Sequence, residues 1–173
     1  NEFKLNNIHF DNLSKPNISN YILYGGVNFI DSRITLKNIV VTNSNEEDAM
    51  NIINSNSKIY NIKFENIFAD ALDLDFGKSY FENISCYKIN NDCLDLSGVI
   101  LDGNNIEVQY ANDKALSIGE NSKENIKNLI LKNIKLGVAV KDGSNVYLEN
   151  IISQNNEYDL ALFNKKNEFD IPN

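Results

Sequence analysis

The sequence predicts an all-β fold, a parallel β-helix solenoid of about seven coils with a period of 22–23 residues. The first indication is the pattern apolar-x-Asn-apolar-x-apolar, which returns at a nearly constant spacing. The second is that Ile-, Val-, Phe- and Tyr-rich segments alternate with period two and never sustain helical spacing. Leucine-rich repeats, which also have short periods, would need an L-x-x-L-x-L pattern that this chain lacks. The asparagines of the repeat are Asn7, Asn38, Asn61, Asn83, Asn105, Asn128 and Asn150.

The six asparagines from Asn38 to Asn150 are expected to form a ladder along one corner of the coils. Equivalent residues in adjacent coils lie about 4.8 Å apart, so their side-chain amides can hydrogen-bond along the stack. Asparagine also tolerates the left-handed backbone that a sharp corner requires. A second, partial row is predicted at Asn12, Asn43, Asn66, Asn133 and Asn155, interrupted by Lys88 and Tyr110. The predicted inward rows are Ile39, Ile62, Ile84, Ile106, Leu129, Ile151 and Val41, Phe64, Cys86, Val108, Leu131.

Residues 1–166 are predicted to form a single domain, with one irregular segment and a tail. The extra residues of the first, longer repeat fall in 13–32, which contains Pro16 and is predicted to be a loop projecting from the first coil. This loop could be a lid or a tolerated surface insertion. Residues 167–173 are expected to leave the stack. No capping helix is evident, so neighbouring domains of a longer chain are expected as partners.

The composition excludes some classes of partner. A chain of 173 residues with 42% hydrophobic and 23% charged residues is globular. The net charge of −8 argues against binding to nucleic acid, which requires a basic surface. No run of 18 apolar residues is present, so no membrane span is predicted. Cys86 and Cys93 fall in different rows of the repeat and are predicted to be free thiols.

An acidic motif is the main candidate for chemistry. The stretch 70–76, DALDLDF, has looser copies at 48–53, 92–97 and 115–119. Its alternation directs Asp73, Asp75 and Asp95 to an outer face. The aspartates that open the copies, Asp48, Asp70, Asp92 and Asp113, are expected to accept backbone N–H bonds at turns.

Aligning the coils gives three neighbouring columns on this face. A column of small residues is expected to leave a shallow groove beside the carboxylates. Candidate ligand-binding residues are Asn51, Asp73, Asp95, Ser117 and Lys141. The two polar columns are Asn51, Asp73, Asp95, Ser117, Ala139, Ala161 and Ile53, Asp75, Ser97, Gly119, Lys141, Phe163, and the small column is Ala49, Ala71, Cys93, Ala115, Gly137.

Three interpretations of the aspartates remain open. Asp73 and Asp95 are expected about 5 Å apart at the backbone, and Asp73 and Asp75 about 6.6 Å. These separations suit the carboxylate pairs of retaining and inverting glycosidases, about 5–5.5 Å and 6.5–9.5 Å respectively. The carboxylates could instead share a Ca²⁺ ion, although no dedicated set of metal ligands is assigned. The third interpretation is that they are solvent-facing residues of an acidic protein.

With these motifs, the chain resembles the right-handed parallel β-helix repeat family of the pectin-lyase-like superfamily, which comprises carbohydrate-binding proteins and sugar hydrolases. The resemblance is carried by the Asn ladder and by the stretches 70–76, 92–98 and 113–120. It implies right-handed coils, a polysaccharide or glycan ligand and a secreted or cell-surface location. Related hydrolases carry Gly-His-Gly and Arg-Ile-Lys motifs that this chain lacks; its one histidine is His9 and its one arginine is Arg33.

Two functions are therefore predicted. The first is a non-catalytic carbohydrate-binding or scaffolding module of a surface or envelope protein, which agrees with the missing His and Arg motifs. The alternative is a polysaccharide lyase or glycoside hydrolase, with Asp73, Asp75 and Asp95 as the catalytic residues.

Overall fold

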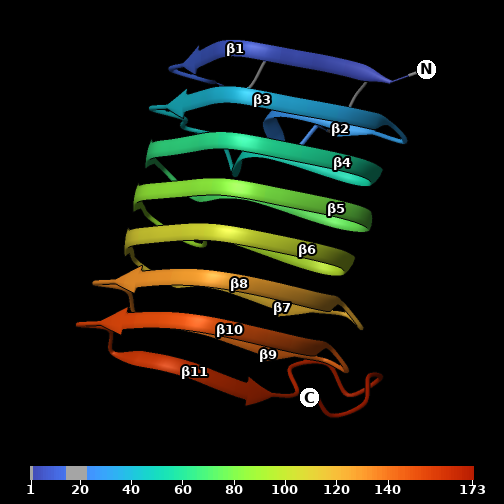
Figure 1. Cartoon of the computed structure of the whole chain (residues 1–173), viewed down its shortest axis with the longest axis vertical. Helices are drawn as coiled ribbons and strands as arrows, with labels where there is room; N and C mark the ends of the chain where they lie inside the picture. Colours follow the sequence, from blue (N-terminus) through green and yellow to red (C-terminus); the bar gives the residue numbers. More distant parts are fainter. Residues whose placement is uncertain (1, 15–22) are drawn as a thin grey trace.

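The computed structural model describes residues 2–14 and 23–173 as a stack of β-coils with parallel strands (Figure 1). The stack makes about six turns, close to the predicted seven, and contains no helix among the described residues. None of these residues therefore forms a helix that could cross a membrane. The strands are β1 (Phe3–Asp11), β2 (Gly25–Ile30), β3 (Arg33–Thr42), β4 (Asp48–Ile67), β5 (Asp70–Ile89), β6 (Leu94–Ala111), β7 (Lys114–Gly119), β8 (Lys123–Lys132), β9 (Leu136–Lys141), β10 (Asn145–Gln154) and β11 (Tyr158–Phe163).

The strands pair in the register that the repeat predicts. Ile62 of β4 pairs with Ile39 of β3 on one side and Ile84 of β5 on the other. One predicted boundary needs correction: β2, at Gly25–Ile30, lies inside the predicted loop 13–32 and pairs in parallel with β4. Residues 15–22 of that loop lie outside the described residues. The end of the chain after β11 contains no strand, but Asn173 exchanges two backbone hydrogen bonds with the segment Ser144–Val146.

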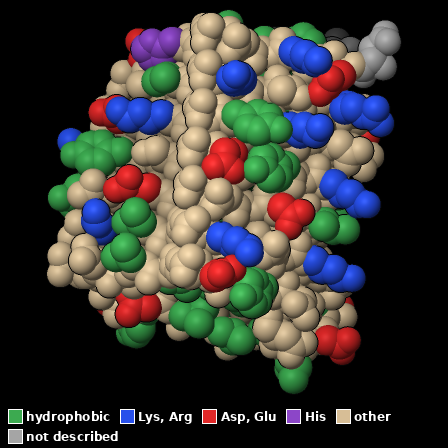
Figure 2. Space-filling view, in the orientation of Figure 1, with side chains coloured by type: hydrophobic (Ala, Val, Ile, Leu, Met, Phe, Trp, Pro, Cys, Tyr) green, Lys and Arg blue, Asp and Glu red, His purple; other side chains and the backbone are tan. Residues whose placement is uncertain are grey.

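The predicted Asn ladder is confirmed. All seven asparagines have left-handed backbone, with φ between 54° and 59°. Each side-chain amide donates to the asparagine of the preceding coil over 2.8–3.1 Å, except that Asn128 donates to Asn104 instead of Asn105. Figure 2 views the face of β1, β3, β8 and β10, where an uncharged vertical strip runs between charged side chains.

Two further rows of left-handed residues form the other corners. The second predicted row is confirmed and includes Lys88 at φ 57° and Tyr110 at φ 62°, so the turn persists where asparagine is replaced. Strand pairing on both sides imposes this conformation whatever the residue. The third row has no common residue type and was not predicted: Asp31, Asn54, Phe76, Gly98, Glu120 and Asp142.

The inward rows form the hydrophobic core, with side chains that are at most 1% exposed in the middle coils. Ile151 is an exception at 44% exposed, because β10 pairs with β8 alone and no other described strand covers its far side. The predicted small column is also buried: Ala49, Ala71, Cys93 and Ala115 have no exposed surface. These residues lie at or just before the start of their strands and are buried, so they do not form the floor of the shallow outer groove expected beside them.

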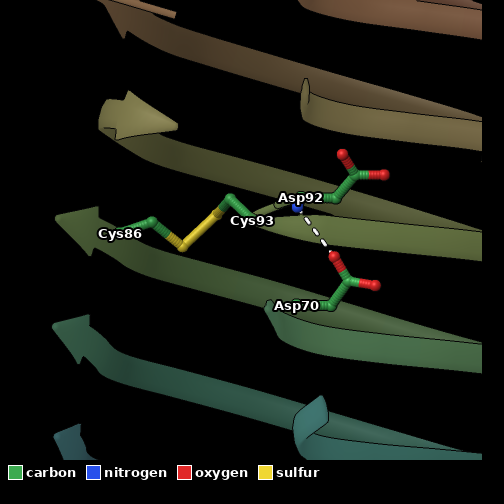
Figure 3. Close-up of a disulfide and its surroundings, with 4 residues drawn as sticks. All are labelled: Asp70, Cys86, Asp92 and Cys93. Carbon is green, nitrogen blue, oxygen red and sulfur yellow. Dashed lines mark hydrogen bonds between the residues drawn. A yellow bond between two sulfur atoms is a disulfide. The ribbon is translucent and has the colours of Figure 1, made fainter. Parts of the chain in front are cut away.

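The prediction of two free thiols was wrong. Cys86 at the end of β5 and Cys93 just before β6 form a disulfide, with Cα atoms 6.1 Å apart (Figure 3). The corner between the two strands turns the chain back on itself, so that both side chains point into the core. Positions that are not equivalent in the repeat can thus meet across one corner.

Candidate functional site

The structure brings the predicted site residues together in the expected columns. Asp73 of β5 pairs with Asn51 of β4 and with Asp95 of β6, and the column continues through Ser117 of β7. In the next column Asp75 pairs with Ile53 and Ser97. Because parallel strands in register direct equivalent side chains to the same side, these groups form one surface. We call this surface the polar stripe: Asn51, Asp73, Asp75, Asp95, Ser117 and Lys141.

The stripe has accessible and inaccessible members. Asp73, Asp75 and Asp95 are partly exposed, whereas Asn51 and Ser117 are each only 1% exposed and Lys141 is 8% exposed. Direct contact with a ligand is thus available to the three aspartates. Asn51, Ser117 and Lys141 are too buried for such contact in this structure; Asn51 hydrogen-bonds to Asp73, and Lys141 to Ser117.

Asn51 fixes the carboxyl groups around it. Its side-chain amide donates to Asp48 over 3.1 Å and to Asp73 over 2.9 Å. Its carbonyl oxygen Oδ1 is buried without a hydrogen-bond partner among the described residues. Asn51 therefore fixes the orientation of the Asp73 carboxyl group, and its own carbonyl oxygen remains able to accept a hydrogen bond.

The stripe keeps one carboxyl group neutral. Burial, followed by the charges of Asp75, Asp48 and Asp95, raises the pKa of Asp73 to about 9. Burial and the nearby Glu120 also raise the pKa of Asp75. At neutral pH Asp73 carries a proton, so it can donate as well as accept a hydrogen bond.

The row of aspartates at the adjacent corner bears out its predicted role in part. Asp70 accepts the backbone N–H of Asp92 over 2.7 Å (Figure 3). Asp92 in turn accepts the backbone N–H of Lys114 over 2.9 Å. In contrast, Asp48 accepts from the Asn51 side chain, and Asp113 accepts from the side chains of Lys114 and Lys135. Burial is the main cause that raises the pKa of Asp48, Asp70 and Asp92 to about 6 each. These groups hold the corner together and add negative charge beside the stripe when they ionise.

Lys141 closes the other end of the stripe. Its Nζ donates to Ser117 Oγ over 2.7 Å. Its stem lies beside Gly119, where an added Cβ would be in ordinary van der Waals contact with Lys141 Cε at 3.5 Å. Burial lowers the pKa of Lys141, and the charge of Asp95 opposes this effect. The lysine therefore supports the hydroxyl of Ser117 and offsets the charge of Asp95.

The residues that would complete a hydrolase or lyase site lie elsewhere. His9 is on β1, where its Nε2 lies 2.8 Å from Thr42 Oγ1, and Arg33 is on β3. Neither strand carries a member of the stripe. Within the described ranges, no three His, Cys, Asp or Glu residues are arranged to hold a metal ion.

Two features of the structure were not predicted from the sequence. Glu124 of β8 faces inward between Leu101 and Val146; it is 4% exposed, and its carboxyl oxygens have no partner among the described residues. Burial, then the charge of Asp102, raises its pKa to about 9. The position of residue 124 in the repeat does predict that its side chain points inward, although the burial of an unpaired carboxyl group there was not predicted. The second feature is a depression of about 490 Å³ around Arg33, Lys58 and Lys78, for which no motif gave a signal.

Compared with protein-family models, curated proteins and solved structures, the chain has no significant match in any of the three.

Proposed function

We propose that this chain is a non-catalytic carbohydrate-binding module, with the polar stripe as its contact surface on a rigid scaffold. The observation that carries the proposal is the in-register row of the partly exposed Asp73 and Asp95, where burial and neighbouring carboxyl groups raise the pKa of Asp73 to about 9. A sugar hydroxyl both donates and accepts hydrogen bonds, and a protonated carboxyl matches it in both roles, whereas a carboxylate only accepts. The proposal includes the right-handed coil, the pectin-lyase-like relationship and a secreted or cell-surface location.

The scaffold supports this role. The Asn ladder and the parallel pairing hold the stripe in one geometry before a ligand arrives, which lowers the entropy cost of binding. Equal spacing of about 4.8 Å between coils suits a ligand with repeated units. If no glycan binds, the same rigidity suits a scaffolding role in a surface or envelope protein.

A second candidate is a glycoside hydrolase or polysaccharide lyase. The observation that favours it is the raised pKa of Asp73 next to Asp75 and Asp95, since a general acid needs a proton at working pH. The lack of His or Arg in the stripe favours the binding module. The two functions make different predictions for conservative variants of Asp73.

The experiment compares Asp73→Asn and Asp73→Ala on a panel of neutral oligosaccharides, measuring binding by calorimetry and cleavage by the release of reducing ends. A binding module keeps most of its affinity in Asp73→Asn, because the amide also donates and accepts, and loses it in Asp73→Ala. A hydrolase loses turnover in both variants, since neither an amide nor a methyl group can act as a general acid. Asp102→Asn is the matched control, because Asp102 is exposed on another face. Equal affinity of the wild type and Asp73→Ala would exclude the stripe as the contact surface.

A further inference from the structure

The depression beside the third corner gathers unpaired positive charge in an acidic protein. It has a volume of about 490 Å³, and Arg33, Lys58 and Lys78 line it together with Tyr80. All four side chains are exposed, and none of the three cations forms an ion pair within the described residues. Figure 2 shows Lys and Arg side chains gathered at the upper right of this face. In a chain with net charge −8, these three side chains form a locally positive region of the surface.

The parallel register explains why the cations converge. Arg33, Asn56 and Lys78 are consecutive members of one column, in β3, β4 and β5. Lys58 and Tyr80 are consecutive members of the column two residues further along the strands. Because adjacent coils are about 4.8 Å apart and alternate residues about 6.6 Å, the three cationic side chains surround one patch of the sheet.

The remaining groups of the depression suit a ligand that contains a ring with polar substituents. Tyr80 is 38% exposed as a residue, and its ring packs against the ring of Tyr60, with centroids 5.6 Å apart. The hydroxyls of Ser57 and Ser79 hydrogen-bond to each other over 2.8 Å beneath the patch. Glu2 is the one acidic residue that lines the depression, and Thr35 and Lys4 engage it. Glu82 lies beside the depression and accepts from the Tyr80 hydroxyl over 2.9 Å, and neither carboxylate forms an ion pair with the three cations. The patch thus offers cations for an acidic group and an aromatic face for a ring.

We propose that this depression is a second binding site, for an oligosaccharide whose sugar rings carry carboxylate or sulfate groups. The acidic group would contact Arg33, Lys58 and Lys78, and a ring would stack on Tyr80. The polar stripe lies across the corner formed by Phe76 and Gly98 and presents carboxyl groups, so an anionic sugar is repelled there. The two surfaces therefore select ligands of different charge. A negative result for one surface leaves the proposal for the other unaffected.

The test measures binding by calorimetry with a uronic acid oligosaccharide, a sulfated oligosaccharide, a neutral oligosaccharide of equal length and sodium sulfate alone. The triple variant Arg33→Gln/Lys58→Gln/Lys78→Gln is expected to lose at least about tenfold in affinity for one or both acidic sugars. The matched control, Lys88→Gln/Lys123→Gln/Lys165→Gln, changes the net charge equally at exposed positions elsewhere and is expected to bind like the wild type. Comparison of the two acidic sugars identifies the preferred group.

Two further measurements separate a built site from general charge attraction. Tyr80→Ala is expected to weaken binding of the acidic sugar by about two- to tenfold and to leave binding of sodium sulfate unchanged. Thermal unfolding of each variant checks that the fold is kept. Equal loss in the triple variant and its control, equal binding of the neutral sugar, or sulfate binding as tight as the sugar would overturn the proposal.

Discussion

Asn51 donates its side-chain amide to Asp73 across adjacent coils over 2.9 Å, and it also donates to Asp48 within its own coil over 3.1 Å. One buried amide thus joins two carboxyl groups whose pKa values are raised to about 9 and about 6. The arrangement depends on Asn51 being uncharged, because a third acidic group there would face two others.

Asn51→Asp is expected to destabilise the protein by about 3–5 kcal/mol at neutral pH, because it buries an unpaired carboxylate. The loss should shrink below about pH 5, where the new group can take up a proton. Urea unfolding at both pH values measures it. Asn51→Leu, which adds no charge, is the control and should show a loss that depends less on pH. A loss in Asn51→Asp that is the same at both pH values would contradict the electrostatic origin.

Asn61→Ala is expected to lower the free energy of unfolding by about 1–3 kcal/mol. The substitution removes hydrogen bonds to Asn38 and Asn83 and places a Cβ-bearing residue without local hydrogen bonding at φ 54°. Asn61→Gly loses the same amide but tolerates the left-handed backbone, so its loss should be smaller. Thermal unfolding of both variants separates the two contributions, and equal stability of Asn61→Ala and the wild type would argue that the ladder is not stabilising.

Ile84→Asp should prevent folding, because the side chain is 1% exposed and has apolar neighbours in the coils on both sides. Ile84→Val is the control and should cost only about 0.5–1.5 kcal/mol. Circular dichroism and thermal melts report both. A cooperative melt of Ile84→Asp close to that of the wild type would contradict the inward position of this row.

Glu124 is expected to make the protein less stable as pH rises. An unfolded glutamate titrates near about 4.3, whereas Glu124 in the folded state titrates at about 9. Between these values the folded state holds a proton that the unfolded state releases, so stability is highest below about pH 4 and falls up to about pH 9. Each such group contributes at most about 1.4 kcal/mol per pH unit.

Glu124→Gln removes this group without adding a charge, so its stability should fall less steeply between about pH 5 and 9 than that of the wild type. Urea unfolding midpoints across the range measure the slope. Asp73 contributes in the same direction and remains in the variant, so some slope is retained. Equal slopes for the two proteins would show that Glu124 is ionised or solvated in the folded state.

Reduction of the disulfide is expected to cost about 2–3 kcal/mol, because the bond closes a short loop between residues seven apart. Melting curves with and without reductant measure the difference. A Cys86→Ala/Cys93→Ala variant serves as the control and should be insensitive to reductant. Alkylation of both thiols in denaturant without reductant would show that the bond is absent from the purified protein.

The columns of the solenoid were predictable because they depend on one local property. An asparagine that tolerates left-handed backbone recurs every 22 or 23 residues from Asn38 onward, and alternation assigns each strand residue to one side. From these facts follow the pairing of Asn61 with Asn83 and the shared column of Asp73 and Asp95. The third corner was missed because strand pairing, rather than one residue type, imposes its left-handed backbone.

The sequence by itself therefore determined which residues become neighbours along the stack, since a fixed period converts spacing into register. Only the tertiary structure decided what happens across a coil, where non-equivalent positions meet. The Cys86–Cys93 bond, the burial of Asn51 and the unpaired carboxyl of Glu124 all belong to this second class. The physical reason is that the period fixes which residues stack on one another, and alternation fixes whether a strand residue points inward or outward. Burial and contacts across a coil depend instead on how the corners bend the chain within each coil.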